Sequence, residues 1–507
     1  MSNTARIQSS FPLAMGHIQL ERAATAPLHQ QLYDQIRAAI LSQRLEPGSQ
    51  LPATRRLAAT LGVSRNTVMN AIDQLHAEGY LESKVGAGTF VSSQLPEELL
   101  EARNAPVPDA APAALPTRTL SQRGQRLNQA RRFRPVPPAP TAEPIHFDPG
   151  VAAADAFPFA TWARLQRRFC RDIAGGLPES YLAPAGYQPL RESIATFLKA
   201  SRAIDCAAEQ IIITNGSQQA LYLAAQVLLD PGDEALVEEP GYNGATMAIR
   251  ASSGRIIPLP VDDEGMSIQL AGPKAPGARV AFVTPSHQFP LGITMSLRRR
   301  LEILTWAEQT DGWIVEDDYD SLYRYEGQPL AALQGLDTNQ RVLYVGTFSK
   351  VMFPGLRLGY IVVPPDIVEA FLAMRSCIDL HPPAPAQAVM HQFITEGHFA
   401  RHLRRMLNLY GERRDHFVAA AQAQLGDWLT LGPSDSGMHI TGLFHEMLDD
   451  EAVWLAGRRR AIRFSPLSRH FYGPPTLSGI AFGFANLPPA TIDRGLTRLA
   501  AAIREVR

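Results

Sequence analysis

Lys350 is a single lysine inside a run of apolar and small residues, and its setting suits covalent chemistry. The stretch 343–346 reads as the end of a strand, so Lys350 is expected on the loop beyond it, where open α/β sheets bind ligands. Hydroxyls flank the lysine at Thr347 and Ser349, and Arg357 follows seven residues after it. A desolvated amine forms Schiff bases with aldehydes, while hydroxyls and a guanidinium suit a phosphate. The combination predicts pyridoxal 5′-phosphate; the simpler interpretation is a lysine that extends from a strand end into solvent.

Two upstream stretches carry the groups that such a cofactor would need. The apolar run 210–214 predicts a buried strand, after which Gly216, Ser217 and Gln218 open a helix. Free amides at a helix N-terminus, joined by a serine hydroxyl, bind phosphate, although an ordinary strand-to-helix turn has the same pattern. Tyr242 follows a further predicted strand, and its ring can stack on a pyridine ring. Together with the lysine stretch, these residues favour the cofactor.

Consecutive acids follow another predicted strand, 313–315, in the order Glu316, Asp317 and Asp318, with Tyr319 next. A carboxylate that faces a pyridine nitrogen keeps it protonated, and a tyrosine hydroxyl can bond the neighbouring phenolic oxygen. The alternative is a solvated acidic loop.

The lysine stretch resembles the Schiff-base motif of fold-type I aminotransferases, with a phosphate-binding arginine after it. This resemblance implies an α/β domain over residues 145–507 with a mixed, mostly parallel sheet covered on both faces. It assigns Lys350 to the aldehyde, Asp317 to the ring nitrogen and Tyr319 to the phenolic oxygen.

Two positions depart from the aminotransferase pattern. The slot that usually holds an asparagine against the phenolic oxygen contains Phe289, which leaves His287 and Gln288 as candidates to replace that contact. The slot of the arginine that grips the substrate's α-carboxylate contains Ala481. Loss of a bidentate clamp should weaken the positioning of amino acids.

Size and composition bound the remaining possibilities. A chain of 507 residues with 45% hydrophobic residues should form two or more domains with sizeable cores. The net charge of −1 gives no global argument for nucleic acid. Three cysteines without close spacing predict neither a disulfide framework nor a zinc site, and no other metal site is expected. No run is long enough to span a membrane and no signal-peptide core is evident, so a cytoplasmic location is expected.

Residues 1–94 predict a small DNA-binding domain. Apolar residues four apart over 28–40 form one helical face; a second helix is expected from Thr54 to the glycine at 62, and a third after Ser64. Two helices joined by a tight glycine turn describe a helix-turn-helix, in which exposed Arg65 and Thr67 can reach base edges or phosphates. A glycine-bearing hairpin over 80–91 would form a wing.

The segment 26–93 closely resembles the winged helix of the GntR family. In that family, DNA contacts come from an arginine near the second helix, the start of the recognition helix and the wing tip. The matching positions here are Arg55, Arg65, Thr67 and Gly86, with Ser64, Asn66 and Lys84 as neighbours able to touch phosphate. A winged helix used only for protein contacts is the alternative.

Residues 95–144 predict a semi-extended linker, because ten prolines and nine alanines among them leave no sustained helical or strand period. A GntR-type head tethered to an aminotransferase-like domain resembles the MocR family of bacterial regulators. The resemblance implies a transcription regulator that senses an amino compound or the vitamer itself, through an internal and then an external aldimine at Lys350. It also implies operator DNA as a partner and a homodimer with exchanged heads. The alternative is an active aminotransferase with a fused DNA-binding head.

Overall fold

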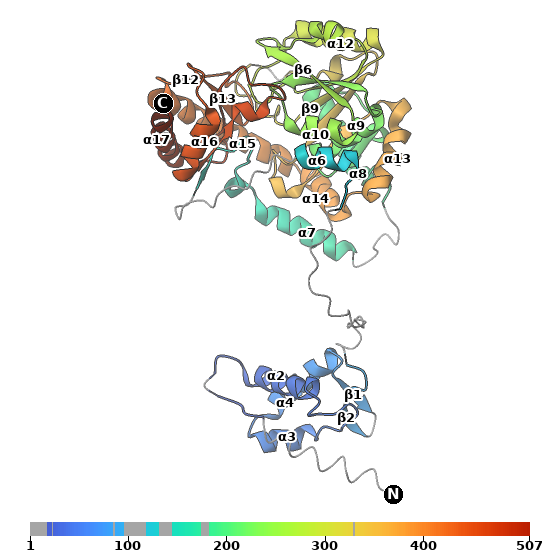
Figure 1. Ribbon diagram of the computed structural model, residues 1–507. Helices are drawn as coiled ribbons and strands as arrows, with labels where there is room; N and C mark the ends of the chain where they lie inside the picture. Colours follow the sequence, from blue (N-terminus) through green and yellow to red (C-terminus); the bar gives the residue numbers. More distant parts are fainter. Residues whose placement is uncertain are drawn as a thin grey trace. The chain divides into compact units, whose positions relative to one another are not determined.

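The computed structural model describes residues 18–22, 24–84, 87–95, 118–130, 144–173, 182–327 and 330–507, with side chains only as far as 128 in the fourth range. The chain divides into two compact units, Met1–Arg118 and Thr119–Arg507 (Figure 1). We call them the head and the large unit, and each is described by itself.

The head is a three-helix bundle with a small hairpin. Its helices are α2 (Leu28–Leu41), α3 (Thr54–Leu61) and α4 (Arg65–Ala77). Leu32, Leu57 and Val68 meet in one apolar core that is shielded from solvent. Gly62 ends α3 in the left-handed conformation, and Ser64 accepts a hydrogen bond from the Thr67 amide at the start of α4. The predicted helix-turn-helix is thereby confirmed.

The wing of the head is an antiparallel pair, β1 (Leu81–Lys84) and β2 (Gly88–Val91). Val91 of β2 is buried in the core of the head, so one end of the hairpin is anchored there. Gly86, predicted at the wing tip, lies outside the described residues.

The large unit is built on a mixed eight-stranded sheet in the order β4-β11-β10-β9-β8-β5-β6-β7. Strands β10, β9, β8, β5 and β6 run parallel to one another, whereas β11 and β7 are antiparallel to their neighbours. The strands are β4 (Ile211–Thr214), β5 (Glu234–Glu239), β6 (Arg255–Asp262), β7 (Gly265–Met266), β8 (Ala278–Val283), β9 (Trp313–Asp318), β10 (Val342–Thr347) and β11 (Gly359–Val362). Each apolar run that predicted a strand in this domain forms one.

Both faces of this sheet are covered. On one face, Val237 and Val345 pack with apolar residues of α9 (Ser217–Leu228), α10 (Asn243–Ala251) and α13 (Val368–Asp379). On the other, Leu236 and Ile314 pack with α11 (Ala271–Lys274) and α12 (Leu297–Thr310). Adjacent Leu236 and Val237 face opposite sides because side chains alternate along a strand. A sheet apolar on both faces explains the continuous hydrophobic runs in the sequence.

A second layer follows toward the C-terminus. A four-stranded antiparallel sheet, in the order β12-β13-β16-β15, is flanked by α15, α16 and α17 (Figure 1). Its strands are β12 (Leu429–Leu431), β13 (His439–Phe444), β15 (Ser465–Pro466) and β16 (Gly479–Gly483), and β14 (Ile462–Arg463) pairs with β3 (Ile145–His146). The remaining helices are α7 (Phe159–Ile173), α8 (Gln188–Arg202), α14 (Ala384–Thr395), α15 (His398–Leu425), α16 (Asp450–Arg459) and α17 (Pro489–Val506).

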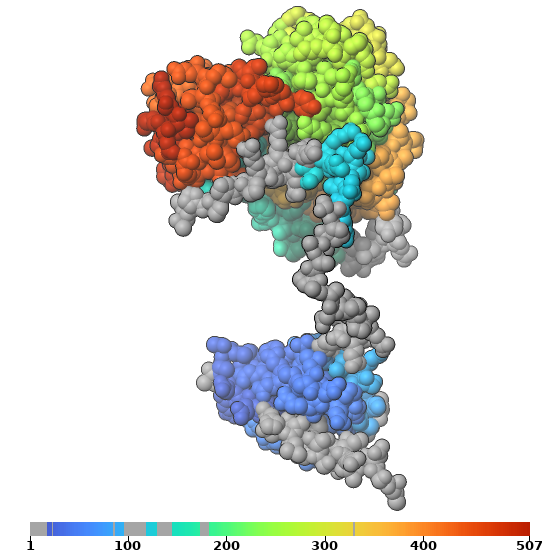
Figure 2. Space-filling model, viewed as in Figure 1, coloured from blue at the N-terminus to red at the C-terminus, as the bar shows by residue number. Residues whose placement is uncertain are grey.

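Part of the predicted linker forms a helix, α6 (Gln122–Ala130), which lies against α10 on the outer surface of the large unit (Figures 1 and 2). The sequence predicted no regular element there. The helix is mostly polar and exposed, so the sequence shows no apolar face that would predict it. Packing against α10 stabilises the helix instead. Among the described helices, none is long and apolar enough to cross a membrane.

Candidate functional site

A cavity of about 110 Å³ opens at the carboxyl ends of the central parallel strands. Five of its lining residues follow five different strands of the large sheet, a sixth lies within β9, and the other three come from the segment after β3 and from β13. The lining residues are Pro149, Gly150, Ser217, Tyr242, Phe289, Asp317, Tyr319, Lys350 and His439. The fold therefore brings together groups that the sequence spreads over almost 300 positions, at the sheet edge where such folds bind ligands.

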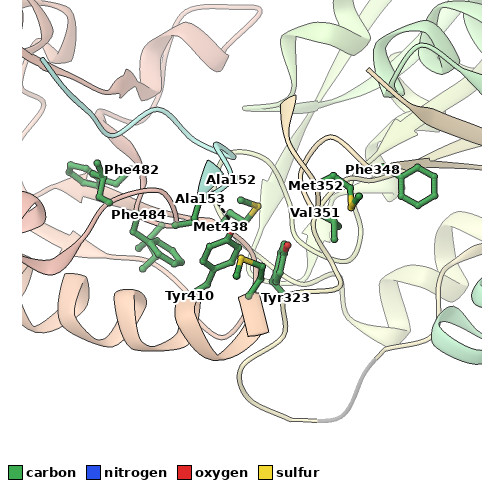
Figure 3. Close-up of a cluster of buried hydrophobic side chains, with 14 of the residues drawn as sticks. Ala152, Ala153, Tyr323, Phe348, Val351, Met352, Tyr410, Met438, Phe482 and Phe484 are labelled. Carbon is green, nitrogen blue, oxygen red and sulfur yellow. Dashed lines mark hydrogen bonds between the residues drawn. The ribbon is translucent and has the colours of Figure 1, made fainter. Parts of the chain in front are cut away.

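Lys350 lies just past the end of β10, between apolar residues that anchor its loop. Phe348, Val351 and Met352 are all buried, and Figure 3 shows them gathered on the same turn. The Lys350 ammonium donates to the carbonyl oxygen of Gly150 at 3.0 Å. Burial lowers the pKa of Lys350, and the charges of Asp320 and Asp317 oppose that shift in part. A lowered pKa increases the fraction of Lys350 that is present as the free amine, which is the nucleophilic form.

Asp317 is separated from its acidic neighbours by the alternation of β9. Glu316 and Asp318 point to the opposite face, where Glu316 accepts from the Leu333 and Gln334 amides and Asp318 lies 2.8 Å from the Arg202 guanidinium. Asp317 faces the cavity, and its Oδ1 has no hydrogen-bond partner among the described residues. Burial, followed by the charge of Asp318, raises the pKa of Asp317 to about 7. These acids belong to a buried strand and not to a solvated loop.

Two tyrosines frame the cavity with hydroxyls that stay protonated. The Tyr319 hydroxyl donates to the His287 carbonyl oxygen at 2.9 Å, and burial raises its pKa well above the usual value. Burial also raises the pKa of Tyr242 to about 12. Gln218 does not line the cavity: its amide donates to the Gly244 carbonyl and accepts from the Tyr242 hydroxyl, so it holds the Tyr242 ring in place.

The predicted phosphate groups lie close to one another at the start of α9. Gly216 precedes this helix with a φ of +87°, and a Cβ there would come within 3.0 Å of Arg357 Nη2. Arg357 donates to the Asn215 carbonyl oxygen at 2.9 Å. Ser217 lines the cavity, whereas Gly216 and Arg357, which lie next to each other, are not among its lining residues. A guanidinium beside a helix N-terminus forms an anion-binding arrangement.

Thr347 and Ser349 lie on the loop between β10 and Lys350 and differ in how their hydroxyls are used. The Thr347 hydroxyl donates to the Leu358 carbonyl and accepts from the Ser349 amide, which shapes the loop. The Ser349 hydroxyl is buried and has no partner within the described part of the chain. A hydroxyl buried without a partner is costly, and a bound acceptor such as phosphate would satisfy it.

Pyridoxal phosphate fits these residues. Asp317 Oδ1 and Ser349 Oγ are buried polar atoms that lack partners within the described ranges, and each is of the type that a ring nitrogen or a phosphate oxygen would meet. Lys350 would hold the aldehyde, Asp317 would face the ring nitrogen, Tyr242 would flank the ring, and Ser217 and Arg357 would face the phosphate.

Neither candidate for the displaced asparagine contact reaches the cavity wall. Gln288 is buried, and its amide donates to Glu238 and to the carbonyl oxygens of Pro240 and Phe289. His287 is held by Asp320 behind Tyr319. The wall at this point is Phe289, whose ring centroid lies 5.7 Å from that of Tyr242.

His439 lines the cavity and was not predicted. It is a lone histidine in β13, and only the return of this distant strand to the site reveals it. In the described part of the chain, His287, Asp320 and His439 form the one group whose ligand-type atoms lie within 4.8 Å of one another. Both Asp320 oxygens already accept hydrogen bonds, from His287 and from the Met438 amide, and His439 bonds the Pro290 carbonyl. These contacts describe a hydrogen-bond network, not a metal site.

The head presents most of its predicted DNA contacts at the start of α4. Arg65 and Asn66 are exposed in its first turn, and Arg55 is exposed in the first turn of α3. Ser64 and Thr67 are bonded to each other, since the Thr67 amide donates to Ser64 Oγ at 3.1 Å. Their first role is therefore to cap α4.

Lys84 lies at the end of β1, exposed, with its ammonium 5.1 Å from the centre of the Phe90 ring. This contact keeps its charge near the wing. Gly86, beyond it, falls outside the described residues, so its predicted DNA contact stays a prediction.

Comparison with known proteins agrees with both units. Residues 28–91 match the family described as bacterial regulatory proteins, gntR family, and residues 155–499 match aminotransferase class I and II. The chain is 44% identical to the probable rhizopine catabolism regulatory protein MocR of Rhizobium meliloti, over 95% of each chain. It is 33% identical to the HTH-type transcriptional regulator TauR of Rhodobacter capsulatus, over 94% of this chain and 96% of TauR.

Among solved structures, the large unit resembles kynurenine aminotransferase from Pyrococcus horikoshii, determined in complex with PMP, with a TM-score of 0.67 and 27% identity. The match covers 77% of this chain and 95% of the aminotransferase. The full-length relatives carry both units, whereas this structure matches most of the large one. The chain therefore belongs to the MocR family of transcriptional regulators, in which a GntR-type winged helix-turn-helix is fused to an aminotransferase class I and II domain.

Proposed function

We propose that this regulator binds pyridoxal phosphate at Lys350 and that an amino compound, or the vitamer itself, changes the affinity of the heads for operator DNA. The observation that carries the proposal is the cavity, where Lys350, past the end of β10, meets Asp317 and Tyr319 at the end of β9. Pyridoxal phosphate supplies an aldehyde that condenses with amines and a ring that withdraws electrons.

Each residue of the site has a role that follows from its surroundings. Lys350 offers an amine whose pKa is lowered by burial, beside the carbonyl oxygen of Gly150. Asp317 offers a carboxylate without another partner among the described residues, suited to hold a proton on a ring nitrogen. Tyr319 has a hydroxyl that stays protonated, and it would donate to a ligand by turning away from the His287 carbonyl oxygen.

The DNA side of the proposal rests on the head. Arg55, Arg65 and Lys84 are exposed cations on its helix-turn-helix and wing, and Asn66 is an exposed amide beside them. Residues 1–94 contain eight Lys and Arg against six Asp and Glu, so electrostatic attraction to phosphate from one head is modest. Two heads in a homodimer would bind two half-sites and gain from their high effective concentration. A ligand changes this binding only if it binds one arrangement of the dimer more tightly.

The test is Lys350→Ala, with Lys274→Ala as the matched control because Lys274 is an exposed lysine in α11 of the same unit. Wild type and the control should take up pyridoxal phosphate with a new visible absorption band, and both should change their operator affinity with effector. Lys350→Ala should lack the band and the response while it still binds operator DNA. An unaltered band in Lys350→Ala would overturn the proposal.

An active aminotransferase with a fused head is the second candidate, favoured by the intact set of Lys350, Asp317 and Tyr319. Ala481 argues against efficient turnover, because it is fully buried in β16 and supplies no cation for a carboxylate. Steady-state transamination with keto acids, measured beside operator binding in one preparation, separates the two. Rapid turnover without operator binding would favour the enzyme.

A further inference from the structure

The imidazole of His439 is held in one tautomer. Its Nε2 lies 3.0 Å from the carbonyl oxygen of Pro290, and because a carbonyl oxygen can only accept, Nε2 carries the hydrogen. The other nitrogen, Nδ1, is then a bare acceptor. It is buried and has no hydrogen-bond partner among the described residues, although the ring is part of the cavity wall.

This imidazole stays neutral. Burial, assisted by the neighbouring His287, lowers the pKa of His439 to about 3. The His287 ring lies 4.6 Å away and is itself tied to Asp320 at 3.0 Å, so the pair cannot rearrange freely. A Cβ at Gly437 would come within 2.0 Å of the His287 ring, which shows how tightly the backbone encloses it. A ring in the cavity wall thus carries a buried nitrogen, Nδ1, that can accept a hydrogen bond but cannot donate one.

His439 stands on the sheet face where an α-carboxylate clamp would stand. In the antiparallel sheet, His439 pairs with Gly483 and Thr441 pairs with Ala481, so His439 and Ala481 point to the same side. Ser465 of β15 pairs with Ala481 from its other flank. Of the described residues that line the cavity, Lys350 alone is cationic, so none beside it can pair with a ligand carboxylate.

We infer that the ligand of this site is an amine that carries a hydroxyl where an amino acid carries its carboxylate, and that His439 Nδ1 accepts the hydrogen bond of that hydroxyl. The inference rests on the proposed function, since the amine must meet the cofactor at Lys350. It names the chemical class of the ligand as an amino alcohol or amino polyol.

A carboxylate is the wrong partner for this wall. Carboxylate oxygens only accept hydrogen bonds, and so does Nδ1. If the two met, their lone pairs would repel each other and neither group would have a hydrogen-bond partner. The charge would also be desolvated without a cation. A hydroxyl donates to Nδ1 and carries no charge. The wall therefore discriminates by hydrogen-bond polarity, which rejects a mismatched ligand more strongly than shape alone.

The test uses full-length protein loaded with pyridoxal phosphate and three matched pairs that differ only in carboxylate against hydroxymethyl. The pairs are alanine with 2-aminopropan-1-ol, serine with 2-aminopropane-1,3-diol, and 4-aminobutyrate with 4-aminobutan-1-ol. Binding is followed by the change in visible absorption and, independently, by the rise in the thermal unfolding temperature. The alcohol of at least one pair should bind about tenfold or more tightly than its acid.

Two variants assign that preference to one atom. His439→Phe keeps a ring but removes the acceptor and should abolish the preference, whereas His439→Asn, which can place its carbonyl oxygen near the position of Nδ1, should retain part of it. His445→Phe changes an exposed histidine of the same region and should behave as wild type.

The outcomes separate the two claims. If the protein takes up no pyridoxal phosphate, the proposed function fails and this inference with it. If the cofactor binds but every acid matches or exceeds its alcohol, the inference alone is overturned. A preference for alcohols that survives His439→Phe would overturn the role of His439.

Discussion

Asp317→Asn should stabilise the cofactor-free protein while it weakens cofactor binding. Asp317 is a buried carboxylate without a hydrogen-bond partner for Oδ1 in the described chain, so the folded protein carries a charge that burial disfavours. Its pKa rises from the usual 3.8 to about 7. At about 1.4 kcal/mol per unit, the charged carboxylate costs the folded state at most about 4 kcal/mol. Asparagine has nearly the same shape and no charge to bury.

The sign of the pH dependence follows from the raised pKa. Below pH 3.8 the carboxyl is protonated in both the folded and the unfolded chain, and Asp317 costs nothing. As the pH rises from 3.8 to about 7, only the unfolded chain ionises freely, so the folded state loses stability. The gain from Asp317→Asn should thus be about 1–2 kcal/mol at pH 5 and should approach its ceiling of about 4 kcal/mol at pH 8.

Tryptophan fluorescence during urea unfolding is a suitable assay, because all five tryptophans lie beyond residue 144 and report only on the large unit. The control is Asp318→Asn, one residue along β9. Asp318 and Arg202 are both buried and lie 2.8 Å apart, so this change leaves a buried guanidinium unpaired and should cost about 3–5 kcal/mol. A lower urea midpoint for Asp317→Asn than for wild type at pH 8, or a gain that does not grow with pH, would refute the reasoning.

Three further changes test other parts of the chain. Gly216→Ala should weaken pyridoxal phosphate binding in an absorbance titration by at least fivefold, because the backbone conformation there costs other residues about 1–3 kcal/mol and the new Cβ would press on Arg357. Ser64→Ala removes the cap on the Thr67 amide and should lower the stability of an isolated 1–94 fragment by about 1 kcal/mol in thermal unfolding; an unchanged unfolding temperature would contradict this. Arg65→Ala should weaken operator binding and reduce the slope of log affinity against log salt by about one unit if Arg65 contacts phosphate, whereas an unchanged slope would exclude that contact.

The strands, and the position of the candidate cofactor groups just past their ends, were predictable because each depends on neighbours in sequence. A short run rich in β-branched residues, such as 211–214, favours a strand buried on both sides, and the glycine and serine at 216 and 217 favour the start of a helix. Lys350 was found for the same reason, as a polar residue placed just past a strand.

What depends on distant partners could not be predicted. The three adjacent acids cannot be told apart from the residues alone: the resemblance selected Asp317, and the alternation of β9, with Asp318 beside Arg202, gives the physical reason why Asp317 faces the cavity. His439 has no local motif, because it enters the site through the packing of a second sheet. The side chain of Gln218 contacts Gly244 and Tyr242, which the sequence did not show, because a helix start fixes where a side chain begins and not which distant group it reaches.

Tyr242 not only lines the cavity but also stands at the start of a helix. It is the residue from which α10 starts, and the flank of that short helix carries α6, which is formed by residues of the linker. A tilt of the ring that turned α10 as a body would displace the anchor of the tether. Coupling of this kind is reciprocal. If ligand binding beside Tyr242 changes the free energy of the α6 contact, a change at α6 alters the free energy of ligand binding by the same amount. A change in the contact between α6 and α10 would then alter the affinity of the cavity for its ligand.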